Sequence, residues 1–290
     1  MPSRLALGTV QFGLSYGITN TSGQVDAEEI ARILHLGRAA GMDTLDTATA
    51  YGESEHRLGD AGVQDWRVVT KLGEPPPDTV SITDWVHAQV HASLVRLRLD
   101  RLAALLLHQS AALHGARGLE LYQALQTLKR DGVVERIGVS IYDPEELAAL
   151  DGAFALDLVQ APYNVLDRRM VTSGWLARLK TRGVEVHTRS AYLQGLLLLD
   201  AEALPRAFAQ WRPLWREWNA WLARRQYTAV QACIGFVCAQ PDIDRVVVGV
   251  ENQRQLQEAI QASTTILDNL PGGFACSDLK LINPARWRIA

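Results

Sequence analysis

Asp46, Tyr51, Lys71 and His108 stand at or just beyond the ends of short apolar segments in this 290-residue chain. Adding a hydride to a carbonyl builds negative charge on its oxygen, and a positioned proton donor must neutralise that charge. A tyrosine phenol can donate this proton, and a nearby lysine ammonium favours the phenolate that remains. An aspartate would hold the ammonium in place, and a histidine would orient the substrate oxygen. Each residue alone could be a cap, a loop aromatic or a structural histidine, but together and in this order they predict carbonyl reduction.

The apolar segments that precede these residues are rich in β-branched residues and leucine and lack polar alternation, which is typical of strands buried on both faces of a parallel sheet. Strands alternating with helices predict a closed (β/α)8 TIM barrel, in which side chains at the carboxyl ends of the strands meet at one mouth. An open doubly wound sheet is the alternative, but no GxGxxG motif follows the first strand. We expect residues 1–290 to form one domain. The predicted strands are Leu5–Thr9, Met42–Thr47, Val68–Leu72, Leu102–His108, Arg136–Ser140, Leu158–Tyr163, Val184–Ser190 and Val246–Val250.

Helical spacing of apolar residues, with glycine or proline at several boundaries, predicts the helices between the strands. An additional helical face carries four tryptophans, and we expect it to pack on the barrel, with a substrate or subunit surface as the alternative. These tryptophans are Trp211, Trp215, Trp218 and Trp221. The other predicted helices are Asp26–Ala40, Thr83–Leu99, Gly118–Asp131, Pro144–Leu150, Ser173–Arg182 and Gln253–Gln261.

The composition argues against several classes of protein. A net charge of −3 and the absence of a basic run predict no binding to nucleic acid or to an anionic membrane surface. No segment reaches the ~18 consecutive apolar residues of a membrane span. Three cysteines without CxxC spacing favour free thiols in a reducing cytoplasm, and no metal site is predicted. We therefore expect a cytoplasmic protein, as a monomer or a small homo-oligomer, acting on a small molecule.

The run Asp46-Thr47-Ala48, Tyr51-Gly52 and Ser54-Glu55 resembles the aldo-keto reductase superfamily, and the similarity continues along nearly the whole chain. The segment from residue 7 to residue 20 is similar to a bacterial branch linked to surface polysaccharides. The resemblance implies a (β/α)8 barrel that binds NADP(H) without a Rossmann fold, with Tyr51 as the general acid. It also implies a carbonyl substrate, with a sugar-derived carbonyl as one possibility.

The resemblance further implies a set of cofactor-binding residues, although Ile141 replaces the usual asparagine after Ser140. Arg189 stands where an aromatic ring often stacks on the nicotinamide, and a planar guanidinium can stack there too. The implied positions are Thr9 and Asp46 near the ribose, Ser140 and Gln160 at the carboxamide, Arg189, Ser190, Leu193 and Gly195 from the seventh strand onward, and Gly249, Gln255 and Glu258 at the adenine end.

The adenine end decides between the two nicotinamide cofactors. The family as a whole favours NADP(H) over NAD(H), but NADPH-preferring relatives place lysine or arginine where this chain has Gly249 or Glu251. Glu251 would repel a 2′-phosphate, and Arg254 is the cation available to compensate. The alternative to a reductase is a non-catalytic cofactor-binding subunit that senses redox state or regulates a partner. The set of Asp46, Tyr51, Lys71 and His108 argues against this alternative, because a protein that only binds the cofactor need not keep these residues.

Overall fold

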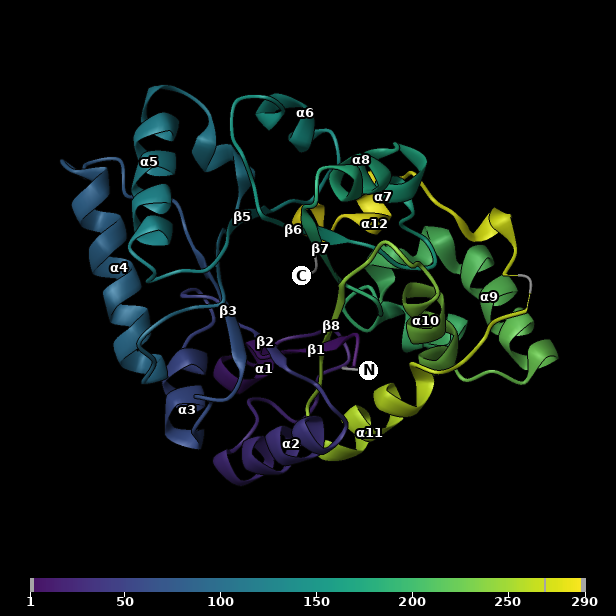
Figure 1. Cartoon of the computed structure of the whole chain (residues 1–290). Coiled ribbons are helices and arrows are strands. Elements are labelled where there is room, and N and C mark those ends of the chain that lie inside the picture. Colours follow the sequence, from purple (N-terminus) through teal and green to yellow (C-terminus); the bar gives the residue numbers. More distant parts are fainter. Residues whose placement is uncertain (1–2, 269, 288–290) are drawn as a thin grey trace.

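Eight parallel strands form a closed barrel in which every strand pairs with the next and β8 pairs with β1 (Figure 1). This computed structural model describes residues 3–268 and 270–287. The predicted TIM barrel is confirmed, and six of the strands are shorter than the predicted segments because pairing stops where the chain turns into loops, whereas β3 begins one residue earlier and β8 is shifted by one residue. The strands are β1 Leu5–Gly8, β2 Thr44–Asp46, β3 Arg67–Leu72, β4 Ala104–Leu107, β5 Ile137–Ser140, β6 Leu158–Pro162, β7 Glu185–Arg189 and β8 Arg245–Gly249.

Helices cover the outside of the barrel, as Figure 1 shows, and each begins or ends within a few residues of its predicted boundary where one was predicted. The α-helices are α1 Val10–Gly13, α2 Ala27–Ala39, α3 Ser54–Ala61, α4 Ile82–Leu97, α5 Ala116–Arg130, α6 Glu146–Leu150, α7 Arg169–Thr172, α8 Trp175–Thr181, α9 Arg212–Arg225, α10 Ala229–Cys238, α11 Gln253–Ala262 and α12 Leu279–Ile282. The 3-10 helices are η1 Ser110–Leu113, η2 Leu196–Leu198, η3 Ala201–Ala203, η4 Arg206–Trp211, η5 Gly272–Phe274 and η6 Pro284–Arg286. Among the described residues, no helix has the length and apolar character needed to cross a membrane.

The apolar interior is divided among a main core, a second cluster and a small third cluster of strand residues, Val69, Ala104, Leu106 and Leu158. The main core joins the strands to the surrounding helices α2, α4, α5 and α8. The second cluster lies around α9, where Trp215, Trp218 and Trp221 are buried against the segment that follows β7. The prediction that four tryptophans on one helical face pack on the barrel is confirmed for these three, whose neighbours are a loop and the C-terminal segment as well as α10. Trp211 lies before this helix, in η4, and is half-buried.

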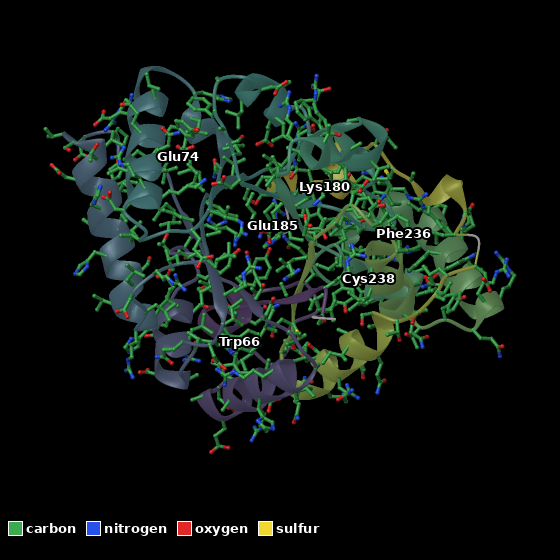
Figure 2. The ribbon with its side chains drawn as sticks, in the orientation of Figure 1. Trp66, Glu74, Lys180, Glu185, Phe236 and Cys238 are labelled. Carbon is green, nitrogen blue, oxygen red and sulfur yellow. The ribbon has the colours of Figure 1, made fainter. Side chains whose placement is uncertain are left out.

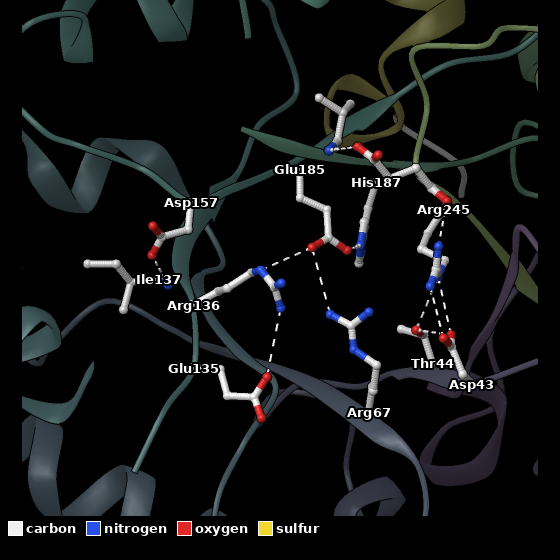
Figure 3. Close-up of polar contacts among 12 residues, drawn as sticks. Asp43, Thr44, Arg67, Glu135, Arg136, Ile137, Asp157, Glu185, His187 and Arg245 are labelled. Atoms are coloured by element: carbon white, nitrogen blue, oxygen red, sulfur yellow. Dashed lines mark hydrogen bonds and ion pairs between the residues drawn. The ribbon is translucent and has the colours of Figure 1, made fainter. Parts of the chain in front are cut away.

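A network of charged side chains closes the amino-terminal end of the barrel, which we call the base (Figure 3). Glu185, which Figure 2 shows inside the ring of strands, is 3.1 Å from Arg136 Nε, 3.7 Å from Arg67 Nη2 and 2.8 Å from His187 Nε2. Burial opposes ionisation of Glu185, but the contacts with His187, Arg136 and Arg67 outweigh it and lower the pKa of this carboxyl to about 2. The base is thus held by a carboxylate with three partners.

Candidate active site

The four residues predicted to act together meet at the opposite end of the barrel, the mouth. Asp46 is the last residue of β2, Lys71 lies in β3, His108 follows β4, and Tyr51 lies in the loop between β2 and α3. Lys71 Nζ donates to Asp46 Oδ1 at 2.7 Å and to the backbone oxygen of Thr47 at 2.9 Å. The same Nζ is 5.1 Å from the centre of the Tyr51 ring, which meets His108 edge-on with 5.8 Å between ring centres. The phenol therefore sits between an ammonium and an imidazole.

Two electrostatic effects fix the charges at the mouth. Burial opposes the charge of Lys71, but the neighbouring Asp46 and Tyr51 outweigh it and raise the pKa of the ammonium. Burial, together with the positive charges of Lys71 and Arg189, lowers the pKa of His108 to about 4. Near neutral pH the site therefore holds a charged lysine and a neutral imidazole, and a neutral imidazole can donate one hydrogen bond to a substrate oxygen.

A cavity of about 430 Å³ opens above these residues and runs from the mouth towards α11. It is lined by both kinds of predicted residue, those expected to do chemistry and those expected to hold a cofactor. The predicted residues on its wall are Thr9, Asp46, Tyr51, His108, Ser140, Gln160, Arg189, Ser190, Gly195, Gly249, Gln255 and Glu258.

Two predicted residues do not line the cavity. Lys71 lies behind Asp46, where its side chain is only 1% exposed, so it acts through its neighbours. Leu193 was predicted to bind cofactor, but its side chain is fully buried and packs in the second cluster. Leu193 can therefore affect the cavity only indirectly, through the backbone conformation of the loop that contains it.

The deepest part of the wall carries a free hydrogen-bond acceptor. Gln160 Nε2 donates to Asp46 Oδ2 at 2.6 Å, whereas Gln160 Oε1 is buried and has no partner within the described residues. Ser140 lies beside it, paired in register between β5 and β6. Because a buried acceptor without a partner is costly, this atom fits a ligand that donates a hydrogen bond, as a carboxamide does.

Sequence reasoning missed two tyrosines on the same wall. Tyr16 and Tyr142 line the cavity, and the guanidinium carbon of Arg189 lies 4.3 Å from the centre of the Tyr142 ring. Burial and the nearby Tyr51 raise the pKa of Tyr16 to about 12, so it is a poor proton donor near neutral pH. Tyr142 could have been found from the sequence, because it lies two residues after the end of β5 and residues in such positions face the mouth of the barrel.

The loop that follows β7 has an unusual backbone. Ser190, Leu193 and Gln194 have φ angles of 63°, 48° and 53°, and Gly195 has 94°. A non-glycine residue in this left-handed region costs roughly 1–2 kcal/mol. At Gly195 a Cβ atom would lie 2.3 Å from Thr19 Oγ1, so only glycine fits there. This backbone conformation persists only if the surrounding structure enforces it.

The model of the "Aldo/keto reductase family" matches residues 4–269. The chain belongs to this family. Its members are oxidoreductases that act on carbonyls with nicotinamide cofactors, and the unpaired acceptor of Gln160 beside Ser140 fits such a cofactor's carboxamide.

Individual relatives agree with this assignment. The chain is 24% identical to the "NADH-specific methylglyoxal reductase" of Escherichia coli, over 90% of this chain and 89% of that one. It is 25% identical to an Arabidopsis thaliana protein named "Probable voltage-gated potassium channel subunit beta", over 91% of this chain and 90% of that one. The solved structure of an aldo-keto reductase from Bacillus halodurans has the same fold, with a TM-score of 0.70, 21% identity and coverage of 99% of this chain and 96% of that one.

Proposed function

We propose that this protein reduces a small aldehyde or ketone to an alcohol, in the cytoplasm and as a monomer or small homo-oligomer, with Tyr51 as the general acid and NAD(P)H as the reductant. The observation that carries the proposal is the position of Tyr51, whose ring lies near both the Lys71 ammonium and the neutral His108, on the wall of a cavity that runs from the mouth towards α11. Supporting it, the family acts on carbonyls.

Each residue has a task in this proposal. The reduced nicotinamide would supply a hydride to the carbonyl carbon. His108 donates a hydrogen bond that orients the carbonyl oxygen, and Tyr51 passes its phenolic proton to that oxygen as negative charge develops. The ammonium of Lys71 stabilises the phenolate that remains, and Asp46 holds the ammonium in place.

The wall away from the tetrad would hold the cofactor. Ser140 and Gln160 would bind the carboxamide, Arg189 would stack on the nicotinamide, and the loop that begins at Ser190 would bind the pyrophosphate. A sugar-derived carbonyl is the proposed substrate class, and methylglyoxal, named for the Escherichia coli relative, is a second one to test.

The choice between NADPH and NADH rests on the far end of the cavity. The family resemblance favours NADP(H). Against it, Glu251 lines this end, and Arg254 is 3.8 Å from Glu258, which partly offsets its charge. Burial raises the pKa of Glu251, and a hydrogen bond with Ser22 opposes that shift. Both nucleotides therefore belong in the test.

The test combines calorimetric titration of NADPH and NADH with turnover of a panel containing methylglyoxal and several aldoses. We expect Tyr51→Phe to bind cofactor as the wild type does and to lose about 10²- to 10⁴-fold in kcat, the usual contribution of a positioned acid. Tyr16→Phe is the matched control, since Tyr16 lines the same cavity, and we expect it to keep most of the activity.

Two results would contradict the proposal. Equal turnover by Tyr51→Phe and wild type would remove Tyr51 from the chemistry. Tight binding of cofactor without turnover of any carbonyl would favour the non-catalytic sensor or regulatory subunit, for which the name of the Arabidopsis thaliana relative is the supporting observation.

A further inference from the structure

The loop after β7 is held from outside the cavity by helix α9. Trp215 Nε1 donates to the backbone oxygen of Leu196 at 3.0 Å, and Trp218 Nε1 donates to that of Leu197 at 3.1 Å. Both oxygens belong to η2, which begins directly after Gly195. Both indoles are buried, and neither lines the cavity. The two tryptophans therefore touch the loop from the side opposite to the ligand.

A third contact joins α9 to η3, which follows η2, and other contacts hold the loop from the side of the barrel. The amide of Ala201 donates to Asn219 Oδ1 on α9 at 2.8 Å. On the other side, Asn164 Nδ2 donates to the backbone oxygen of Ser190 at 3.0 Å, and Ile18 N donates to that of Gln194 at 3.1 Å. The loop is thus clamped between α9 and the body of the barrel.

We propose that Trp215 and Trp218 are positioning residues, which hold the left-handed backbone of residues 190–195 in the conformation that binds the cofactor. Left-handed conformations of non-glycine residues are unfavourable on their own and persist where the surroundings over-determine them. The indole donors help to enforce this conformation, because each lies on the buried face of α9 and donates to a carbonyl of η2, directly after the left-handed residues. The proposal rests on the proposed function only in naming the ligand.

The two carbonyls that accept from the tryptophans differ in how many hydrogen-bond donors they have. The backbone oxygen of Leu196 also accepts from the amide of Leu199 at 3.1 Å, so it keeps one partner without Trp215. For the oxygen of Leu197, the indole of Trp218 is the hydrogen-bond donor that the structure shows among the described residues. Trp218→Phe therefore leaves a buried carbonyl unpaired, and we expect the larger effect there.

Trp221 provides a matched control on the same helix. Its ring stacks on that of Trp218, with 5.5 Å between centres, and it is equally buried. Its Nε1, however, has no hydrogen-bond partner within the described residues. Trp221→Phe thus removes the same volume and the same stacking contact as Trp218→Phe, but no hydrogen bond to the loop.

The experiment measures cofactor Kd, kcat at saturating cofactor and Tm for the three phenylalanine variants. If the loop spends less time in the conformation that binds the cofactor, the apparent Kd rises in inverse proportion to the fraction of molecules in that conformation. The kcat at saturating cofactor stays nearly unchanged. We expect Trp218→Phe to raise the Kd about tenfold, the equivalent of one lost hydrogen bond, and Trp215→Phe to raise it by less. Trp221→Phe also lowers Tm, though by less because it breaks no hydrogen bond, and leaves the Kd within about twofold. Equal increases of the Kd in all three variants would overturn the proposal, because loss of packing would then suffice.

Amide hydrogen exchange separates this proposal from the proposed function. The amides of Gly195, Leu197 and Leu198 make hydrogen bonds within the loop, at 3.0, 3.1 and 2.9 Å. We expect them to exchange faster in Trp218→Phe than in Trp221→Phe, with or without a nucleotide. Identical exchange in the two variants would refute the bracing role even if the enzyme is a reductase, whereas faster exchange would support it even if neither nucleotide binds.

Discussion

The mouth and the base of the barrel both hold buried charges, but they use them differently. At the base, Glu185 has three partners within the chain and a pKa lowered to about 2, although His187 Nδ1 is buried without a hydrogen-bond partner among the described residues. At the mouth, Lys71 and Asp46 form a buried pair, while Arg189 has no carboxylate within salt-bridge distance among the described residues and Gln160 Oε1 has no partner. The two ends thus differ in their charged groups: at the base the arginines pair with carboxylates of the chain, whereas at the mouth the Arg189 guanidinium and an amide oxygen beside the cavity are left for a ligand.

Acid should affect the two ends in different pH windows, and the mouth gives the larger effect. The folded-state pKa of His108 is lowered to about 4 from an ordinary value of 6.5, so the unfolded chain binds this proton first as the pH falls. Stability is therefore lost between about pH 6.5 and pH 4, by about 3 kcal/mol. Urea unfolding at pH 7, 5.5 and 4.5 measures it, and His108→Gln should have a shallower dependence on pH. Parallel curves for the two proteins would contradict the assignment.

The base should respond at lower pH and without loss of chemistry. The pKa of Glu185 is depressed, so its stabilisation is present above about pH 4.5 and disappears as the pH falls towards 2. We expect Glu185→Gln to lower the free energy of unfolding at pH 7 by about 1–2 kcal/mol, because the two arginines are a third exposed and solvent screens them. Activity should remain.

The control for this variant is Arg182→Gln, which removes a solvent-screened ion pair with Asp151 and should lower the free energy of unfolding by less than Glu185→Gln does. Chemical denaturation and turnover measured on the same samples make the comparison. A loss of activity in Glu185→Gln at a temperature where the variant is folded would show that the base and the mouth are coupled. The base would then affect the chemistry as well as the stability of the fold.

The smallest expected effect concerns the far end of the cavity. Glu251→Gln removes a carboxylate from this wall, and we expect NADPH affinity to rise about tenfold while NADH affinity changes little, because only NADPH carries the 2′-phosphate. Calorimetric titration of both nucleotides measures the change. An equal gain for both would mean that Glu251 acts on the shape of the site and not on the phosphate.

Much of this arrangement could be predicted from residue types and periodicity. Apolar segments located the strands, and the carboxyl ends of parallel strands meet at one edge, so Asp46, Lys71 and His108 could be placed together. The base could not be predicted in this way. Glu185 and His187 alternate within a strand, a pattern equally typical of a solvent-exposed face, and their partners come from β3 and the start of β5.

The contacts of α9 with the loop were also beyond prediction from sequence. The 3–4 spacing of the tryptophans indicates a buried helical face, but it does not say what that face covers. Which indole nitrogen finds a carbonyl depends on how the helix docks, and the three differ in the structure: Trp215 and Trp218 have partners, whereas Trp221 has none in the part of the chain that the structure describes. The spacing of the tryptophans along the chain contains no information about this docking.

The stacked indoles on α9 also give the protein an intrinsic optical reporter. Trp218 and Trp221 lie nearly parallel, with 15° between their planes, and the indole of Trp218 is hydrogen-bonded to the loop that lines the cavity. Emission from a buried indole depends on its hydrogen bonding and on the rigidity of its surroundings. The ultraviolet fluorescence of the unlabelled chain therefore carries information about the state of this loop, without a dye or an engineered residue.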